Sequence, residues 1–215
     1  MDFESVTRTT LFDTFLLLLI GIGPKLALVP FLNATTGMPL ATKRLVLGKM
    51  LTTAGTVAVI LLLLGGLLTR VLHFSTGALS IASGAILFLI AIRMVFGRDN
   101  PAAGSLAVEG KNPLQLAIVP LGVPYLLNPA GIVFLVTASA DAGSLGVIAV
   151  VVVTLIAVLA LDVVVFRWAT QVSEDKIENR LLVTEMVFGF LLAALAVQLA
   201  LNGLAEVGVI SLTGH

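Results

Sequence analysis

The chain has 215 residues, of which 59% are hydrophobic and 11% charged, and its mean hydropathy is +1.14. This composition is far too apolar for an ordinary soluble domain, so we expect an integral membrane protein. Twelve basic residues balance twelve acidic ones and cysteine is absent, which argues against nucleic-acid binding, thiol chemistry and disulfides. We therefore expect membrane lipids and a small-molecule substrate as partners, with no nucleic acid, cofactor or metal.

Six apolar runs are close to the length of about 20 residues that crosses a bilayer. In chain order these runs cover residues 11–32, 46–69, 77–97, 114–138, 145–168 and 182–204. Polar turns separate them, and only the connection at about 98–113 is long. The pattern predicts an all-α membrane protein with six transmembrane helices.

Basic residues are distributed unequally between the two ends of these spans. Only Arg8 and Arg70 lie on the side of the termini. The other side carries Lys43, Arg44, Lys49, Arg93, Arg98, Lys111, Arg167, Lys176 and Arg180. By the positive-inside rule, the first, third and fifth connections face the cytoplasm and both termini face outward, an N-out/C-out topology.

The first and fourth spans are each interrupted by a proline, in Gly23-Pro24-Lys25 and in Asn128-Pro129-Ala130-Gly131. Proline lacks an N–H donor and clashes with the preceding helical turn. Backbone groups freed in this way persist within a membrane only around a cavity or protein contacts. Paired interruptions at matching positions of two halves point to the binding site of a transporter.

A shift of 105 positions aligns the two interrupting prolines, Pro24 and Pro129. The same shift aligns Gly84 with Gly189, Leu87 with Leu192, and Ala91 with Ala196. A unit of three spans that is repeated once inserts its second copy upside down. We therefore expect two inverted three-helix repeats, at 1–100 and 114–215, joined by a cytoplasmic linker at 101–113; the alternative is a chance match of common small and apolar residues.

Lys25 and Asp162 are charged residues well inside apolar runs, where a charge is costly unless it snorkels, pairs or meets water. At a rise of about 1.5 Å per residue, Lys25 lies about 10 Å and Asp162 about 9 Å from the cytoplasmic end of its span. We expect the two to face each other across a cavity, as a structural pair or as a proton-responsive gate. Alternatively, Lys25 snorkels to the interface and Asp162 bonds to a local hydroxyl or water.

Asn128 offers both a donor and an acceptor at the second break, or it simply caps the helix that resumes at Pro129. The N–H groups at a helix restart carry the positive end of the helix dipole, which favours a carboxylate there. We expect no catalytic or metal-binding residue. The candidate substrate-binding residues are Gly23, Pro24, Lys25, Asn128, Pro129, Ala130, Gly131 and Asp162.

Three stretches together resemble the MarC family of integral membrane proteins. They are GPKLALVPFLNATTGMP at 23–39, SIASGAILFLIAIRMVFG at 80–97 and AIVPLGVPYLLNPAGIVFLV at 117–136. The resemblance implies six spans in a bacterial or archaeal plasma membrane and, in some members, transport of small neutral amino acids such as glycine and alanine. The family usually has Asn-Pro at the first break and Gly-Pro-Gly at the second, so the asparagine has changed halves here. Lys25 also departs from the family pattern, and a fixed cation there bears on substrate charge and on ion coupling.

The sequence thus predicts a secondary transporter of a small metabolite, foremost a small neutral amino acid, that works by alternating access around a midplane site. H+ and Na+ are the candidate coupling ions. The alternatives are a structural or assembly membrane protein whose broken helices only pack, and a passive channel. An enzyme is not expected, because the sequence has no H-E-x-x-H, G-x-S-x-G or P-loop motif.

Overall fold

The computed structural model describes residues 3–96, 112–140, 145–171 and 178–211, and within these ranges the chain forms helices joined by short turns. In these ranges, five helical segments are long and apolar enough to cross a membrane, and a sixth span results if two helices bent by 70° at residues 127–128 count as one. The prediction of an all-α protein with several membrane-spanning helices is confirmed. Most of the predicted linker at 101–113 lies outside the described residues.

The described residues of the first half of the chain form four helices. They are α1 (Phe3–Gly21), α2 (Pro24–Thr35), α3 (Leu40–Leu72) and α4 (Thr76–Phe96). The described residues of the second half form five helical segments. They are α6 (Pro113–Leu116), η2 (Ala117–Leu126), α7 (Pro129–Ala140), α8 (Leu145–Ala169) and α9 (Glu178–Glu206).

Proline explains where both interrupted spans break. Pro24 occupies the first turn of α2, where its missing N–H costs nothing, and Gly23 before it has an extended backbone. Within η2, Val119 and Val123 have extended backbone angles because each precedes a proline, a position that disfavours helical geometry. Span 4 is therefore irregular after the short helix α6, from Ala117 onward, and becomes a regular α-helix again only from Pro129.

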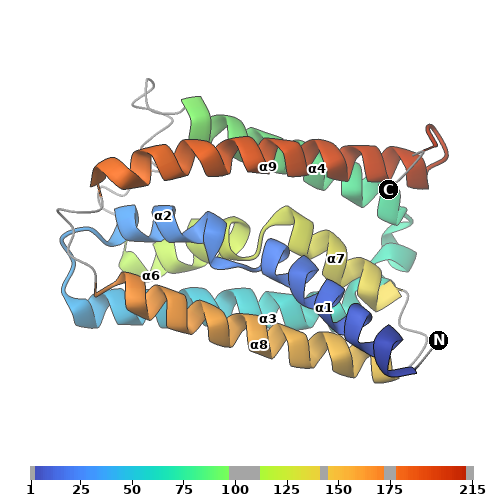
Figure 1. The fold of residues 1–215 in the computed structure, drawn as a ribbon, viewed down its shortest axis with the longest axis horizontal. Helices are drawn as coiled ribbons and strands as arrows, with labels where there is room; N and C mark the ends of the chain where they lie inside the picture. The colour runs from blue at the N-terminus through green and yellow to red at the C-terminus, as the bar shows by residue number, and fades with distance from the viewer. Residues whose placement is uncertain (1–2, 97–111, 141–144, 172–177, 212–215) are drawn as a thin grey trace.

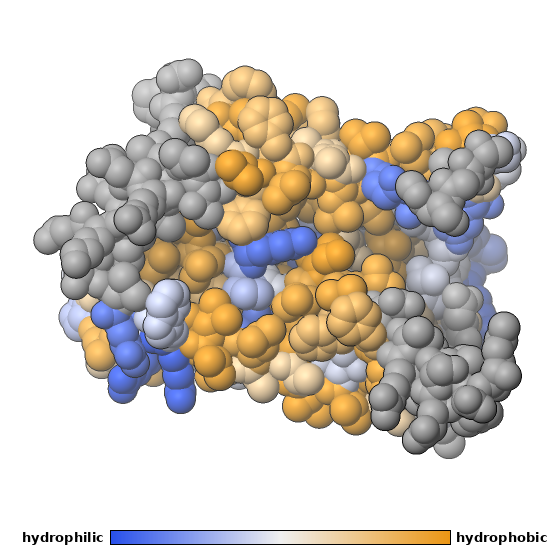
Figure 2. Space-filling model, in the orientation of Figure 1, coloured by the Kyte–Doolittle hydropathy of each residue, from blue (hydrophilic) through white to orange (hydrophobic). Residues whose placement is uncertain are grey.

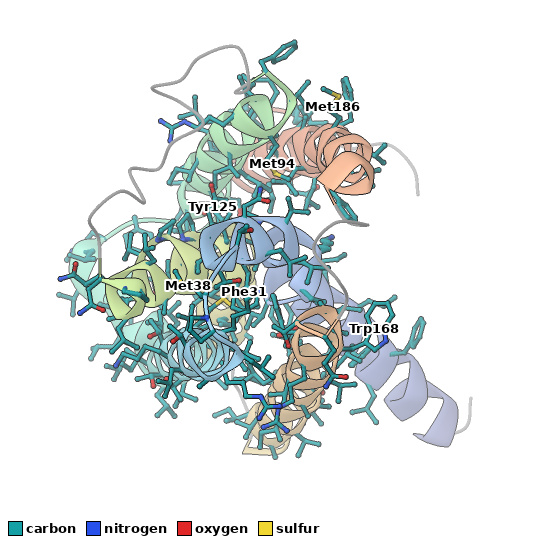
Figure 3. The ribbon with its side chains drawn as sticks, turned by 90° about the vertical axis from the view of Figure 1, so that its left-hand side faces the viewer. Phe31, Met38, Met94, Tyr125, Trp168 and Met186 are labelled. Carbon is teal, nitrogen blue, oxygen red and sulfur yellow. The ribbon has the colours of Figure 1, made fainter. Side chains whose placement is uncertain are left out.

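The helices form three layers (Figure 1). Helices α4 and α9 lie antiparallel to each other on one side, and α3 and α8 lie on the other. The interrupted pairs α1–α2 and η2–α7 fill the layer between them, as the end view also shows (Figure 3). Hydrophobic side chains cover most of one broad face, and hydrophilic ones gather mainly toward its two ends (Figure 2).

Two hydrophobic clusters divide the molecule into two packing units. The larger cluster joins α1, α2, α3, η2, α7 and α8, which we call the main body. The smaller cluster lies between α4 and α9, which we call the α4–α9 pair, and it includes Leu26 from α2. The α4–α9 pair is thus packed mostly on itself, with contacts to the main body through α7 and α2.

Small residues let α4 and α9 approach closely. A Cβ atom added to Gly84 would lie 2.7 Å from the carbonyl oxygen of Ala196, and one added to Gly189 would lie 3.3 Å from the carbonyl oxygen of Ala91. Such close approach of backbones is typical of glycine-containing seams between membrane helices. The two contacts are also reciprocal, because Gly84 and Gly189 are 105 positions apart, as are Ala91 and Ala196.

Candidate functional site

The two helix breaks lie directly against each other in the middle layer. The backbone N–H of Asn128 donates to the carbonyl of Gly21 at 2.9 Å, and its side-chain Nδ2 donates to the carbonyl of Ile20 at 2.6 Å. Its Oδ1 accepts from the N–H of Gly131 at 3.1 Å. Asn128 therefore caps α7 and at the same time bridges to the end of α1, so polar backbone groups freed by one break are satisfied by the other.

Gly21 and Gly131 are the point of closest approach at this crossing. A Cβ atom on Gly21 would lie 2.3 Å from the Cα of Gly131, and one on Gly131 would lie 2.5 Å from the carbonyl oxygen of Gly21. Only glycine fits at either position. Gly131 belongs to the predicted site, whereas Gly21 was not among the predicted residues. The sequence signal that could have indicated Gly21 is its position two residues before Gly23.

The remaining predicted residues of the breaks surround this contact. Gly23 and Pro129 are buried, and Pro24 and Ala130 are partly buried. A side chain on Gly23 would collide with the carbonyl of Leu19 in the preceding helix. The crossing is therefore closed by protein contacts in this conformation, and the breaks act here as a tightly fitted joint.

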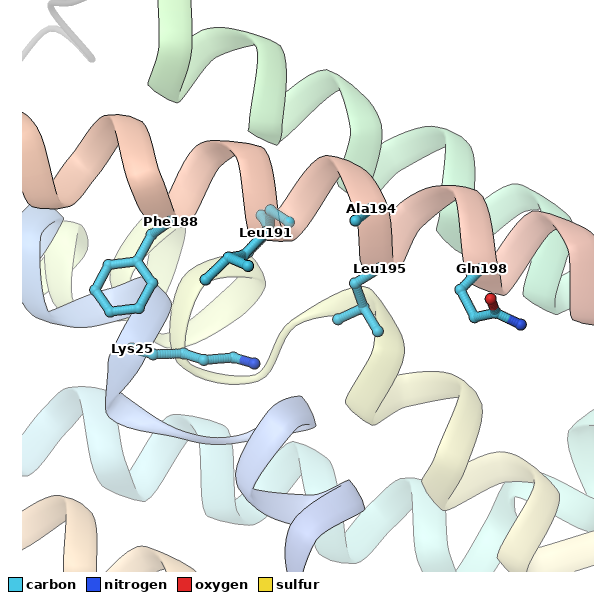
Figure 4. Close-up of a pocket in the computed structure, with 7 residues that line it drawn as sticks. Lys25, Phe188, Leu191, Ala194, Leu195 and Gln198 are labelled. Carbon is cyan, nitrogen blue, oxygen red and sulfur yellow. The ribbon is translucent and has the colours of Figure 1, made fainter. Parts of the chain in front are cut away.

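Lys25 extends away from that joint toward α9. Its side chain is partly buried and lines a cavity of about 380 Å³ between α2 and α9. The other lining residues all come from α9: Phe188, Leu191, Leu192, Ala194, Leu195 and Gln198. Figure 4 shows the ammonium group below α9, between the positions of Leu191 and Leu195. We call this cavity the Lys25 pocket; it lies at the boundary between the main body and the α4–α9 pair.

Asp162 lies in the core of the main body. It is 0% exposed, and both carboxylate oxygens are buried without a hydrogen-bond partner among the described residues. One turn further along α8, Phe166 packs edge-on against Phe31 of α2 with ring centroids 5.2 Å apart. This aromatic contact fixes α8 against α2 beside the buried acid.

The expected pair between Lys25 and Asp162 is not formed. Both oxygens of Asp162 lack a partner among the described residues, while Lys25 points into the pocket beneath α9. No hydroxyl of the described residues donates to Asp162 either. Equal depth in the membrane does not determine which side of a helix a residue faces, and the two residues face different packing units.

Two basic residues predicted to lie at the same end of the protein share a cavity there. Arg44 from the start of α3 and Arg167 from the end of α8 line a space of about 220 Å³ together with Thr170 and Gln171. The first and fifth connections are thus at one end of the helix bundle. That this end faces the cytoplasm stays a prediction.

Together these features define a multi-pass helical membrane protein in which two interrupted helices lock into each other. The family model described as MarC family integral membrane protein matches residues 8–207, so the chain belongs to the MarC family. The resemblance seen in the sequence is thereby confirmed.

Several curated proteins of the same kind are similar to this chain. A UPF0056 membrane protein of Methanocaldococcus jannaschii is 26% identical over 190 residues, covering 85% of this chain and 90% of that protein. The UPF0056 membrane protein YvbG of Bacillus subtilis is 24% identical over 177 residues, covering 81% and 84%. One from Pyrococcus horikoshii is 29% identical over 138 residues, covering 64% of each chain. No solved structure matches the chain significantly.

Proposed function

We propose that the protein is a secondary transporter of a small metabolite, with the Lys25 pocket as its substrate site. The observation that carries this proposal is the position of the pocket, which lies beside a helix break and between two separate packing units. Alternating access needs a site of this kind, flanked by two bodies that can move relative to each other. Small neutral amino acids are the substrate class that the family resemblance implies.

The moving body in this proposal is the α4–α9 pair. Its hydrophobic cluster is nearly separate from that of the main body, and Leu26 is the residue of the main body that enters it. Rocking of the pair about this contact would open the Lys25 pocket to one side of the membrane and then to the other. The joint at Gly21 and Gly131 would keep the two interrupted helices together as one rigid unit during that movement.

The contacts within the α4–α9 pair support the inverted repeat. Gly84 faces Ala196 while Gly189 faces Ala91, so residues 105 positions apart exchange places across the interface. Reciprocal contacts of this type arise from a two-fold axis. We propose that 1–100 and 114–215 are inverted repeats in the plasma membrane, with both termini outside.

Asp162 is the residue we propose for ion coupling. A proton needs only one oxygen. The buried carboxyl of Asp162, whose two oxygens have no hydrogen-bond partner among the described residues, can therefore carry H+.

Uptake into proteoliposomes tests the proposal. Purified protein should take up labelled small amino or organic acids in a saturable manner and exchange them with unlabelled substrate inside the vesicle. Lys25→Met should reduce uptake at least about tenfold, equivalent to about 1.4 kcal/mol, whereas Lys49→Met, at an exposed lysine on α3, should not. A passive channel would give flux without saturation or exchange, and a protein whose closed joint serves only packing would give none.

A further inference from the structure

We infer that the Lys25 pocket binds the carboxylate of an aliphatic acid that carries no ammonium group, with the hydrocarbon part of the ligand against α9. The consequence for transport rests on the proposed function, whereas binding is measurable without it. The chemistry of the pocket wall, the position of the lysine and the length of the apolar stripe support the inference independently of one another.

The pocket presents one cation to an otherwise nearly apolar wall. Among the described residues that line it, Lys25 is the only charged one and Gln198 the only other polar one. No hydrogen bond or ion pair joins Lys25 to another described residue. A cation within a membrane span is costly unless it snorkels, pairs or meets water, and a carboxylate ligand would supply the partner that the described residues do not.

An α-amino acid fits this wall less well than a simple acid. Its ammonium group is attached to the carbon next to the carboxylate, so an amino acid held by Lys25 would bring two positive charges within a few ångströms of each other. Like charges placed this close disfavour binding. Among the described residues, no acidic side chain lines the pocket to compensate. Gln198 donates from Nε2 to Oδ1 of Asn202 at 2.8 Å, and its Oε1 offers an ammonium group only a neutral acceptor.

The remainder of the pocket suits a hydrocarbon chain. Phe188, Leu191 and Leu195 recur at spacings of three and four residues, so they form one stripe along α9. The lining residues extend from Phe188 to Gln198, about 15 Å along the helix axis. The volume of about 380 Å³ lies within the range of small-molecule sites. An acid at Lys25 can thus lay its chain along this stripe.

Such an acid can come from water or from the membrane. A short-chain acid would enter from the aqueous phase, whereas a fatty acid would enter laterally past Leu191, a lining residue that is 59% exposed. Both sources share the carboxylate and the alkyl chain. A chain-length comparison separates them.

The test is equilibrium binding of labelled hexanoate to the purified full-length protein in detergent, with competition by matched analogues. Hexanoate should bind saturably, and hexanamide and norleucine should compete at least about tenfold more weakly, since each removes the net negative charge. Lys25→Met should weaken binding by about tenfold or more, Lys25→Arg should retain it, and the control Lys49→Met should leave it unchanged. Stronger competition by dodecanoate identifies a membrane source, and weaker competition an aqueous one.

A second variant keeps the lysine and fills the pocket instead. Leu195→Trp should abolish hexanoate binding, whereas Val197→Trp, at an exposed position on the same helix, should not. Elution as a single symmetric peak in size-exclusion chromatography would show that each variant is folded.

Two results would overturn the inference. The first is an affinity for norleucine equal to that for hexanoate, and the second is hexanoate binding that is absent or does not depend on Lys25. Saturable amino-acid flux without hexanoate binding would refute this inference and leave the transporter proposal intact. Lys25-dependent hexanoate binding without saturable flux of any solute would support this inference and refute the transporter proposal.

Discussion

At the scale of single residues, two glycines determine how closely the interrupted helices meet. Gly21 and Gly131 bring two backbones into direct contact, and this contact allows Asn128 to reach the carbonyl groups at the end of α1. A larger residue at either position would push the helices apart and leave those polar groups without partners in an apolar environment. The cost of such a change combines overpacking with lost hydrogen bonds.

Gly131→Ala should therefore destabilise the protein by about 2 kcal/mol or more. The matched control is Gly48→Ala on α3, where an added Cβ meets nothing within 4 Å. There, alanine should be neutral or stabilise the helix by up to about 1 kcal/mol. Thermal unfolding in detergent, followed by circular dichroism, measures both. Equal midpoints for the two variants would show that the joint is looser than described.

Asp162 is the second residue whose replacement is informative. Its carboxylate is fully buried without a partner among the described residues, an arrangement that costs free energy and is typical of functional positions. Asp162→Asn keeps the shape and removes the ionisable group. We expect an unfolding midpoint equal to or above that of the unchanged protein and a loss of proton-dependent uptake. A midpoint lowered by several degrees would indicate that the carboxylate makes a stabilising contact instead.

At the scale of helices, the interrupted spans were predictable from sequence and their surroundings were not. Pro24 and Pro129 act through their own backbone, so their effect can be inferred locally. The role of Gly21 depends on the position of Gly131, a residue far away in the chain. Glycine is common in membrane helices, so its presence alone did not single it out.

Lys25 shows that side-chain contacts with distant parts of the chain are equally hard to predict from sequence. Its depth in the span follows from counting residues, and that part of the prediction needs only helix geometry. The side of α2 on which it lies depends on how α9 packs, which no local pattern specifies. This is why the sequence suggested Asp162 as its partner, whereas the structure places it in a pocket beneath α9.

At the scale of the whole molecule, the unequal distribution of lysine and arginine predicts the orientation in the membrane. The end that carries the first, third and fifth connections, which we call the basic end, is predicted to face the cytoplasm. The chain contains no cysteine, so single cysteines can be introduced without background. His73→Cys, in the turn between α3 and α4, should react with a membrane-impermeant maleimide in intact cells. Thr36→Cys, between α2 and α3, should react only after permeabilisation. The reverse labelling pattern would place the basic end outside.

The division into two packing units is the feature from which the proposed mechanism follows. The α4–α9 pair and the main body have separate hydrophobic clusters, and the Lys25 pocket lies between them. A transporter needs this boundary to move, whereas a purely structural protein needs it to stay fixed. Distances across the boundary therefore distinguish the two.

Those distances can be measured by pulsed electron paramagnetic resonance in lipid nanodiscs, with spin labels on exposed residues. Labels at Val197 on α9 and Val59 on α3 span the boundary, and labels at Val59 and Ile156 lie within the main body. We predict two distance populations for the first pair, with a ratio that shifts when a transported solute is added, and one unchanging population for the second. A single population for both pairs, unaffected by any solute that the protein takes up, would contradict alternating access by the α4–α9 pair.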